Sequence, residues 1–314
     1  MTFGFVFPGQ GSQSVGMLAG LTPAPGAASV IRDTFAEASL VLGYDLWEVL
    51  AQGPAERLNA TECTQPAMLA ASIATWRVWG GCGGAEPEVV SGHSLGEFSA
   101  LVAAGALDFP AAIDLVRFRG RIMQEAVPEG TGAMAAILGL DDAQVIEACR
   151  EAAQGGVVEA VNFNAPGQVV IAGAREAVQR AIEAAKARGA KRAVALPVSV
   201  PSHSSLMEPA ARRLGERLAT VDFRPPRIRF VSAVDAQAHR DPADLRQLLV
   251  RQLSSPVRWA DTVRGLAAAG IGTLIECGPG KVLTALSRRI ERGLEALALE
   301  DAGSLAAAIT AVKA

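Results

Sequence analysis

Lysine, histidine and tyrosine are scarce in this chain of 314 residues, which has four lysines, three histidines and one tyrosine. The first lysine is Lys186, so the glycine-rich loop at Gly9–Gln13 cannot be a phosphate-binding loop that ends in Gly-Lys-Ser/Thr. The four cysteines form no Cys-x-x-Cys pair, which predicts reduced thiols rather than a zinc site or a disulfide framework. These shortages exclude a Walker-type NTPase, and no metal or bound cofactor is implied.

Long apolar runs and a large net charge are also missing. No stretch approaches the ~18 apolar residues of a membrane helix, and residues 1–9 lack a basic flank, so neither a membrane span nor a targeting segment is predicted. The net charge of −3 provides no field that would attract nucleic acid or an anionic membrane. We therefore expect a cytoplasmic globular enzyme, and at about 150 residues per domain the length favours two domains.

Short apolar runs alternate with glycine-rich turns and helical segments over most of the chain. The run 3–7 closes in Pro8–Gly11, and the run 89–91 leads through Gly92 into a helix over 95–106. Further on, strands are predicted over 227–232 and 273–277, and helices over 243–252 and 259–269. This order predicts an α/β fold with a largely parallel sheet.

Residues 128–198 follow a different rhythm. Their predicted order is β-α-β-β-α-β, the ferredoxin-like arrangement. Proline-containing joints at both ends indicate an insertion, so we expect a catalytic subdomain of residues 1–127 and 199–314 and a small subdomain of residues 128–198. The expected elements are strand 132–140, helix 142–153, strands 157–162 and 168–172, helix 176–188 and strand 193–200.

A Gly-x-Ser-x-Gly pentapeptide at Gly92–Gly96 is the clearest indication of chemistry. Its glycines allow a sharp strand-to-helix turn that presents the hydroxyl of Ser94, while the following amide, Leu95 N–H, points toward a developing oxyanion. The loop at Gly9–Gln13 is suited to supply a second amide. A catalytic serine is favoured over a glycine-rich turn without chemistry.

A serine nucleophile needs a base, and histidine suits neutral pH. His93 is adjacent to Ser94, where neighbouring side chains diverge, and His239 lies in a polar stretch typical of a solvated loop. His203 follows an apolar strand and precedes a helix, as active-site residues often do in open α/β sheets. We favour His203, with a capping or core histidine as the alternative. Serine before histidine is also the order of α/β-hydrolase-like enzymes.

Arg119 is separated from its neighbouring arginines by helical geometry. At about 100° per residue, the helix after Asp108 places Arg117 and Arg121 on its polar side and Arg119 in the middle of its apolar side. A buried guanidinium without an anion costs several kcal/mol, so Arg119 is either a structural ion pair or a bidentate ligand of a substrate carboxylate. Position alone does not favour one of these.

One notable basic cluster lies near the end of the predicted helix 176–188. It consists of Lys186, Arg188, Lys191 and Arg192. The cluster is either a solvated helix end or a dock for an acidic partner.

Together these motifs resemble those of the malonyl-CoA:acyl-carrier-protein transacylases of fatty-acid synthesis, and they do so in the family's order over nearly the whole chain. Phe98 departs from the pattern, which has a tyrosine at this place. The matching segments are Phe7–Gln13, Thr64–Pro66, Gly92–Glu97, Arg119–Gly120, Met123–Ala126, Gly130–Met134, Val161–Asn164, Pro166–Gly173, Val200–His203, Val250–Gln252 and Gly278–Lys281.

The resemblance implies a role for each matching site residue. Ser94 is the nucleophile and His203 the base, and the backbone carbonyl of Gln252 orients His203 in place of an acidic third residue. Gln10 and Leu95 supply the oxyanion amides. Arg119 binds the malonyl carboxylate, Met123 lines the acyl pocket, and Lys191 and Arg192 contact the acidic carrier protein. The resemblance also implies an α/β-hydrolase-like large subdomain, a coenzyme A thioester as substrate without a separate cofactor, and a monomer.

Three other functions stay open from the sequence. A related malonyl or acyl transferase could serve polyketide synthesis or malonate decarboxylation. A thioesterase or esterase could use the same serine turn, although Arg119 argues against it. A non-catalytic carrier-binding protein is disfavoured by the presence of both Ser94 and His203.

Overall fold

The computed structural model describes residues 2–128, 130–198 and 200–313. Within these ranges six strands form one sheet, which we call the large sheet, in the order β10-β9-β1-β2-β7-β8. All neighbours in it are parallel except β7 and β8, which confirms the predicted α/β fold with a largely parallel sheet. The strands are β1 (Phe3–Phe7), β2 (Val89–Gly92), β7 (Arg229–Val231), β8 (Ala238–His239), β9 (Thr273–Glu276) and β10 (Glu295–Ala298).

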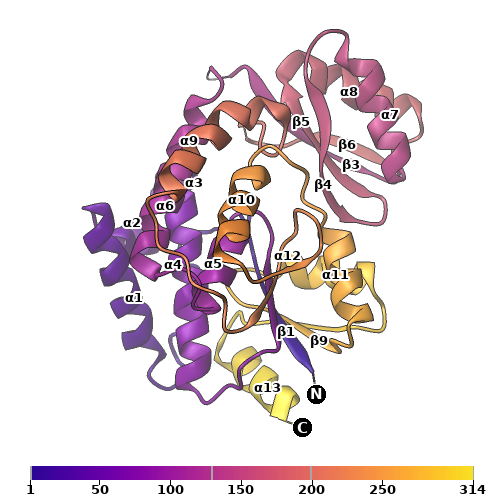
Figure 1. Ribbon diagram of the computed structural model, residues 1–314. Coiled ribbons are helices and arrows are strands. Elements are labelled where there is room, and N and C mark those ends of the chain that lie inside the picture. Colours follow the sequence, from indigo (N-terminus) through magenta and orange to yellow (C-terminus); the bar gives the residue numbers. More distant parts are fainter. Residues whose placement is uncertain (1, 129, 199, 314) are drawn as a thin grey trace.

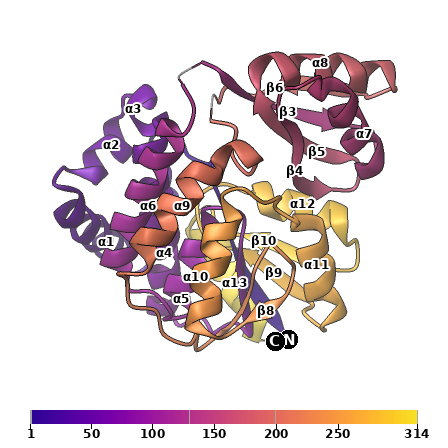
Figure 2. The same ribbon diagram turned by 45° about the horizontal axis from the view of Figure 1, so that its top comes forward.

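Helices cover both faces of the large sheet (Figures 1 and 2). Because side chains alternate along a strand, Phe3, Phe5 and Phe7 of β1 enter the core on one face and Val6 enters the core on the other. The helices of this larger body are α1 (Ala27–Leu42), α2 (Leu46–Gln52), α3 (Ala55–Asn59), α4 (Thr61–Gly81), α5 (Gly96–Ala103), α6 (Phe109–Glu125), α9 (Glu208–Leu218), α10 (Pro242–Gln252), α11 (Trp259–Ala268), α12 (Val282–Ile290) and α13 (Ala302–Lys313), with a 3-10 turn at Ser205–Met207.

The helix α4 is almost entirely buried, because its sequence is apolar around the whole circumference rather than on one stripe. It packs between α1 and α6 and meets β1 through aromatic side chains. The ring of Phe5 lies edge-on to Trp76 and Trp79, with centroids 5.5 and 5.0 Å away. This core fixes β1, and with it the loop that follows at Pro8–Gly11.

A second sheet, the small sheet, has four strands in the described residues, in the antiparallel order β4-β5-β3-β6. This confirms the β-α-β-β-α-β module, and Figure 2 shows it standing beside the larger body. Helix α7 occupies the predicted residues 142–153 because Asp141 and Gln144 form a reciprocal capping box. The elements are β3 (Gly132–Leu138), α7 (Asp142–Ala153), β4 (Val158–Ala165), β5 (Gln168–Ala174), α8 (Arg175–Ala187) and β6 (Arg192–Ala195).

The strand predicted over 193–200 is wrong in its extent. The Leu196 amide still donates to Met134 O at 2.9 Å, but Pro197 has no N–H with which to continue the ladder. Residue 199 of that range lies outside the described residues. His203 therefore lies in a loop before the 3-10 turn and not directly after a strand.

Strand β4 joins the small sheet to the larger body. The Phe163 amide donates to Val257 O at 2.9 Å, and the Val257 amide donates to Val161 O at 2.8 Å. Glu159 also accepts hydrogen bonds from the amide and hydroxyl of Ser205, at 2.7 and 2.9 Å. The loop that carries His203 is thus held by both bodies.

Candidate active site

Ser94 lies in the turn between β2 and α5, with a φ of 53° in the left-handed region. The turn is possible because glycine flanks the serine on both sides. A Cβ on Gly92 would lie 2.0 Å from the carbonyl carbon of Gly96, and one on Gly96 would lie 2.0 Å from Phe7 O. The backbone therefore takes the sharp turn predicted for the pentapeptide, and strained residues of this kind are frequent at functional sites.

The hydroxyl of Ser94 and the imidazole of His203 are in direct contact, with 2.7 Å between Oγ and Nε2. The other ring nitrogen, Nδ1, lies 2.8 Å from the backbone carbonyl of Gln252. A carbonyl only accepts, so Nδ1 carries the proton and Nε2 has a lone pair for the serine hydroxyl. Burial, with a smaller contribution from the positive charge of Arg119, lowers the pKa of His203 to about 3, which keeps the ring neutral.

The guanidinium of Arg119 projects from α6 into the same site and is only 2% exposed. It donates to Gln65 Oε1 at 2.8 Å, to Gln252 Oε1 at 3.0 Å and to Ser94 Oγ at 3.3 Å. All three acceptors are neutral, and within the described ranges no carboxylate lies at ion-pair distance from it. Burial lowers the pKa of Arg119 to about 10, which leaves it charged at neutral pH.

Gln252 connects these groups through its side chain as well as its backbone. Its Nε2 donates to Ser94 O at 3.0 Å and to Glu97 Oε2. Glu97 and Gln65 belong to matching motifs, but the motifs alone assign neither residue to the site. For Glu97 the available signal was a single acidic side chain within an otherwise apolar helical run, whereas Gln65 lies among polar residues at the start of α4 and carries no comparable signal.

Met123 is buried one turn beyond Arg119 on α6. Its sulfur accepts a weak hydrogen bond from Gln65 Nε2 at 3.6 Å, so Gln65 bridges Arg119 and Met123. Ser94, His203, Arg119, Gln252 and Met123 thus belong to one connected set of contacts. The site therefore places a serine and a neutral histidine beside a buried cation. The serine and histidine suit acyl transfer, and the cation suits a substrate that carries a carboxylate.

Comparison with known proteins identifies the family. The acyl transferase domain family matches residues 4–308 of this chain. A malonyl CoA-acyl carrier protein transacylase of Salmonella typhimurium is 57% identical over 310 residues, covering 98% of this chain and 99% of the relative. The chain belongs to the malonyl CoA-acyl carrier protein transacylase family. This confirms the resemblance seen in the motifs, and the protein is an acyltransferase.

Solved structures of family members agree with this fold. An acyl carrier protein S-malonyltransferase of Vibrio cholerae is 56% identical, with a TM-score of 0.95 over 98% of this chain and 100% of that one. A malonyl-transacylase in complex with a type II PKS acyl-carrier protein is 55% identical, with a TM-score of 0.97 over 99% of this chain and 100% of that one.

The two amides expected to bind an oxyanion lie in the loop after β1 and at the start of α5. Neither Gln10 N nor Leu95 N donates a hydrogen bond to another described residue of the enzyme. The loop is held against the serine turn, because a Cβ on Gly9 would lie 2.6 Å from His93 O. Within the described residues neither amide is thus committed to a protein acceptor.

The other two histidines have structural partners. His93 Nε2 lies 2.9 Å from Asn164 Oδ1 of β4, and its ring packs edge-on to Trp259. The solvated loop predicted for His239 is wrong. This residue is half-buried in β8, which pairs with β7, and its Nε2 lies 3.1 Å from Asp235 Oδ1.

Lys191 and Arg192 are exposed at the beginning of β6 and do not contact the residues around Ser94. The rest of the basic cluster is paired on the surface: Lys186 with Glu183 at 2.9 Å, and Arg188 with Glu151. Lys191 and Arg192 have no such ion pair in the described part of the enzyme.

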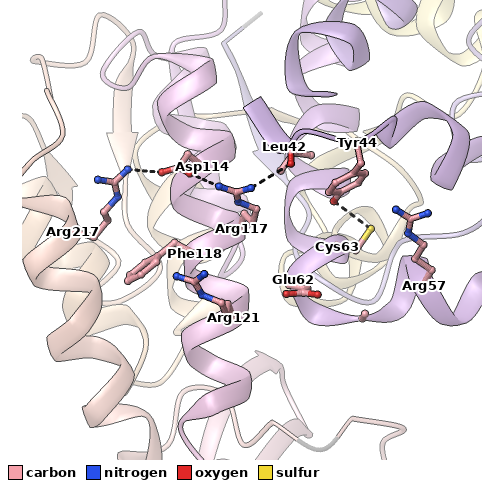
Figure 3. A pocket seen from close by; sticks show the side chains of 11 residues that line it. Leu42, Tyr44, Arg57, Glu62, Cys63, Asp114, Arg117, Phe118, Arg121 and Arg217 are labelled. Atoms are coloured by element: carbon pink, nitrogen blue, oxygen red, sulfur yellow. Dashed lines mark hydrogen bonds and ion pairs between the residues drawn. The ribbon is translucent and has the colours of Figure 1, made fainter. Parts of the chain in front are cut away.

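A cavity of about 720 Å³ lies away from the catalytic groups, between α6, α9 and the segment from Leu42 to Cys63 (Figure 3). It is lined by Arg117 and Arg121, which were predicted on the polar side of α6, opposite Arg119. Asp114 lies between two arginines, with its Oδ1 2.9 Å from Arg117 Nη2 and its Oδ2 2.6 Å from Arg217 Nη2. Its carboxylate neutralises part of the positive charge of the cavity. Ser94, His203 and Arg119 do not line this cavity.

The described residues contain no group of three or more His, Cys, Asp or Glu side chains placed to hold a metal ion. They also contain no helix that is both long and apolar enough to cross a membrane.

Proposed function

We propose that this enzyme transfers the malonyl group of malonyl-CoA to the phosphopantetheine thiol of acyl carrier protein, through a malonyl ester on Ser94. The observation that carries the proposal is the convergence of a histidine-activated serine and a buried, unpaired arginine on one site. The similar proteins named above, a malonyl CoA-acyl carrier protein transacylase and an acyl carrier protein S-malonyltransferase, support the choice of substrates. The following steps use only side chains and backbone amides of the chain.

In the first half-reaction, Ser94 Oγ attacks the thioester carbon while its proton passes to His203 Nε2. The carbonyl oxygen becomes an oxyanion, to which the amides of Gln10 and Leu95 donate hydrogen bonds. Collapse of this intermediate breaks the carbon–sulfur bond, and the coenzyme A sulfur leaves with the proton from His203. The carrier thiol then repeats these steps in reverse, and Ser94 regains its hydroxyl.

Arg119 is proposed to hold the malonyl carboxylate, because a planar guanidinium can donate two parallel hydrogen bonds to it. Met123 lines the pocket beside the bound chain. The carboxylate then supplies the charge partner that the guanidinium lacks within the protein. This contact fixes the acyl group relative to Ser94 and Nε2, and it helps to shield the ester from water.

The exposed pair Lys191 and Arg192 is proposed to contact the acidic carrier protein. Replacing both by glutamate is expected to raise the KM for the carrier about 10-fold and to weaken its salt dependence, because charges at an interface rim act mainly on association. Initial rates at varied carrier and salt concentrations measure this. The KM for malonyl-CoA should stay unchanged.

A matched control reverses two exposed basic residues of the larger body, Arg229 at the start of β7 and Lys313 at the end of α13. This control should leave the carrier KM unchanged. If the Lys191/Arg192 variant shows the wild-type carrier KM and salt dependence, the proposed docking contact is wrong.

The choice of carrier separates the proposal from its nearest alternative. A carrier protein of fatty-acid synthesis should accept the malonyl group faster than a polyketide or malonate-decarboxylase carrier. The observation that favours the polyketide alternative is the solved complex of a similar malonyl-transacylase with a type II PKS acyl-carrier protein. Hydrolysis of malonyl-CoA that outpaces transfer would instead establish a thioesterase.

The proposal also includes the subdomain limits, the cellular compartment and the oligomeric state. The limits at residues 127/128 and 198/199 separate the catalytic and small subdomains, which the two distinct sheets support. The enzyme acts in the cytoplasm, where its four free cysteines stay reduced. It acts as a monomer, since the proposed chemistry takes every group from one chain.

A further inference from the structure

Glu97 is a buried carboxylate on α5, one turn beyond Ser94, and no cation is bonded to it in the described ranges. Its Oε1 accepts hydrogen bonds from Ser232 Oγ at 2.7 Å and from the Ala233 amide at 2.6 Å. Its Oε2 accepts one from Gln252 Nε2. We propose that Glu97 is a positioning residue that selects the orientation of the Gln252 side-chain amide, and thereby places Arg119 relative to Ser94.

The argument depends on the two unlike ends of an amide group. The oxygen of the Gln252 amide accepts from Arg119 Nη2 at 3.0 Å, while its nitrogen donates to Ser94 O at 3.0 Å and to Glu97. The reversed amide would place an NH₂ group against the guanidinium and an oxygen against two acceptors. An ionised carboxylate only accepts hydrogen bonds, so Glu97 excludes the reversed orientation.

The same residue also connects to the base. The backbone carbonyl of Gln252 lies 2.8 Å from His203 Nδ1, so a displaced Gln252 would affect both Arg119 and His203. Among the described residues, however, the Gln252 side chain hydrogen-bonds only to Arg119, Ser94 O and Glu97. A reversed amide should therefore affect recognition of the acyl carboxylate more than the proton transfer.

Protonation of Glu97 should make malonyl transfer depend on pH. In the described part of the chain, the charged or titratable groups nearest to Glu97 are Arg119 across the Gln252 amide, His203 beyond Gln252, and Asp235 in the loop after β7. Burial, with a smaller contribution from Asp235, raises the pKa of Glu97 to about 7. Below that pH the carboxyl gains a proton and becomes a donor, which favours the reversed amide. Malonyl transfer should therefore fall as the pH drops through about 7, while His203, with a pKa of about 3, stays neutral.

The test is the Glu97→Gln variant, assayed with malonyl-CoA and acetyl-CoA over a range of pH. The new side chain keeps an oxygen for Ser232 and Ala233 but presents an NH₂ group to the Gln252 nitrogen. Because a buried polar pair is then mismatched, kcat/KM for malonyl-CoA should fall about 10- to 100-fold, mainly through KM. The rate with acetyl-CoA should change less than about 3-fold. The fall in malonyl transfer as the pH drops through about 7, which we call the malonyl pH limb, should vanish.

Glu276→Gln is the matched control. Glu276 is a second buried carboxyl whose pKa burial raises to about 7, but it lies at the end of β9 and accepts from the Thr284 amide at 2.7 Å. This variant should keep the wild-type malonyl preference and the pH limb. A common loss in both variants would assign the effect to buried charge in general and overturn the positioning role.

The inference rests on the proposed role of Arg119, and the outcomes separate the two. If the wild type does not prefer malonyl over acetyl groups, the proposed function fails. If the wild type prefers malonyl and Glu97→Gln keeps both that preference and the pH limb, only the positioning role fails. Should Glu97→Gln not fold, the wild type decides: a malonyl-to-acetyl ratio that stays constant between about pH 5.5 and pH 8.5 overturns the inference.

Discussion

Replacement of Ser94 by alanine is expected to lower malonyl transfer to the carrier protein by about 10⁴-fold or more, because the acyl group then has no oxygen on which to form an ester. His203 would keep its proton on Nδ1, since Gln252 O still accepts from it. Binding of malonyl-CoA should be retained because Arg119 keeps Gln65 and Gln252 as partners. Initial rates with malonyl-CoA and carrier protein, together with a binding isotherm for malonyl-CoA, measure both quantities.

Ser99→Ala provides a matched control on α5, the helix that follows Ser94. The Ser99 hydroxyl is buried and lacks a hydrogen-bond partner among the described residues, so its removal should leave the rate unchanged. The account would be contradicted if Ser94→Ala retained more than about one hundredth of the wild-type rate, because another residue would then have to carry the acyl group.

Replacement of Arg119 by alanine is expected to reduce kcat/KM for malonyl-CoA by about 10²- to 10³-fold, or about 3–4 kcal/mol of transition-state stabilisation. Acetyl-CoA has no carboxylate to lose a partner, so its kcat/KM should change much less and the malonyl preference should largely disappear. Parallel assays with the two thioesters measure the ratio. A thermal melt checks the fold, because Gln65 and Gln252 each lose a buried donor.

Two further variants separate charge, shape and position. Arg119→Lys keeps the charge but loses the planar fork, so it should fall between the wild type and the alanine variant. Arg121→Ala, two residues along α6, removes a half-exposed guanidinium that faces the cavity and should have no effect on selectivity. An Arg119→Ala enzyme with an undiminished malonyl preference would refute the carboxylate contact.

Much of the fold was predictable because its elements carry local signals. The strand 3–7 is an apolar run closed by a Pro-Gly turn, and helix 142–153 has its capping residues in the adjacent sequence. The strand predicted over 193–200 was wrong because its apolar pattern continues past Pro197, whereas the hydrogen-bonded ladder cannot. A pattern reports which side chains are buried but not which backbone groups find partners.

The residues of the site likewise divide into those with a local signal in the sequence and those without one. Ser94 was found from its flanking glycines and Arg119 from its place on an apolar helix face, both of which are local. The roles of Glu97 and Gln65 depend on partners elsewhere in the chain: Gln252 lies 155 positions from Glu97, and Arg119 lies 54 positions from Gln65. A buried polar side chain acquires a role only through such partners, and only folding brings them together.

The most direct test of the central claim is to mix the wild-type enzyme with malonyl-CoA, without carrier protein, and to locate the covalent product by mass spectrometry of the intact chain and its peptides. The account predicts one malonyl group per chain, attached to Ser94 and released when carrier protein or free coenzyme A is added. Malonyl attached to another residue, or transfer to the carrier without any malonyl-enzyme, would contradict it.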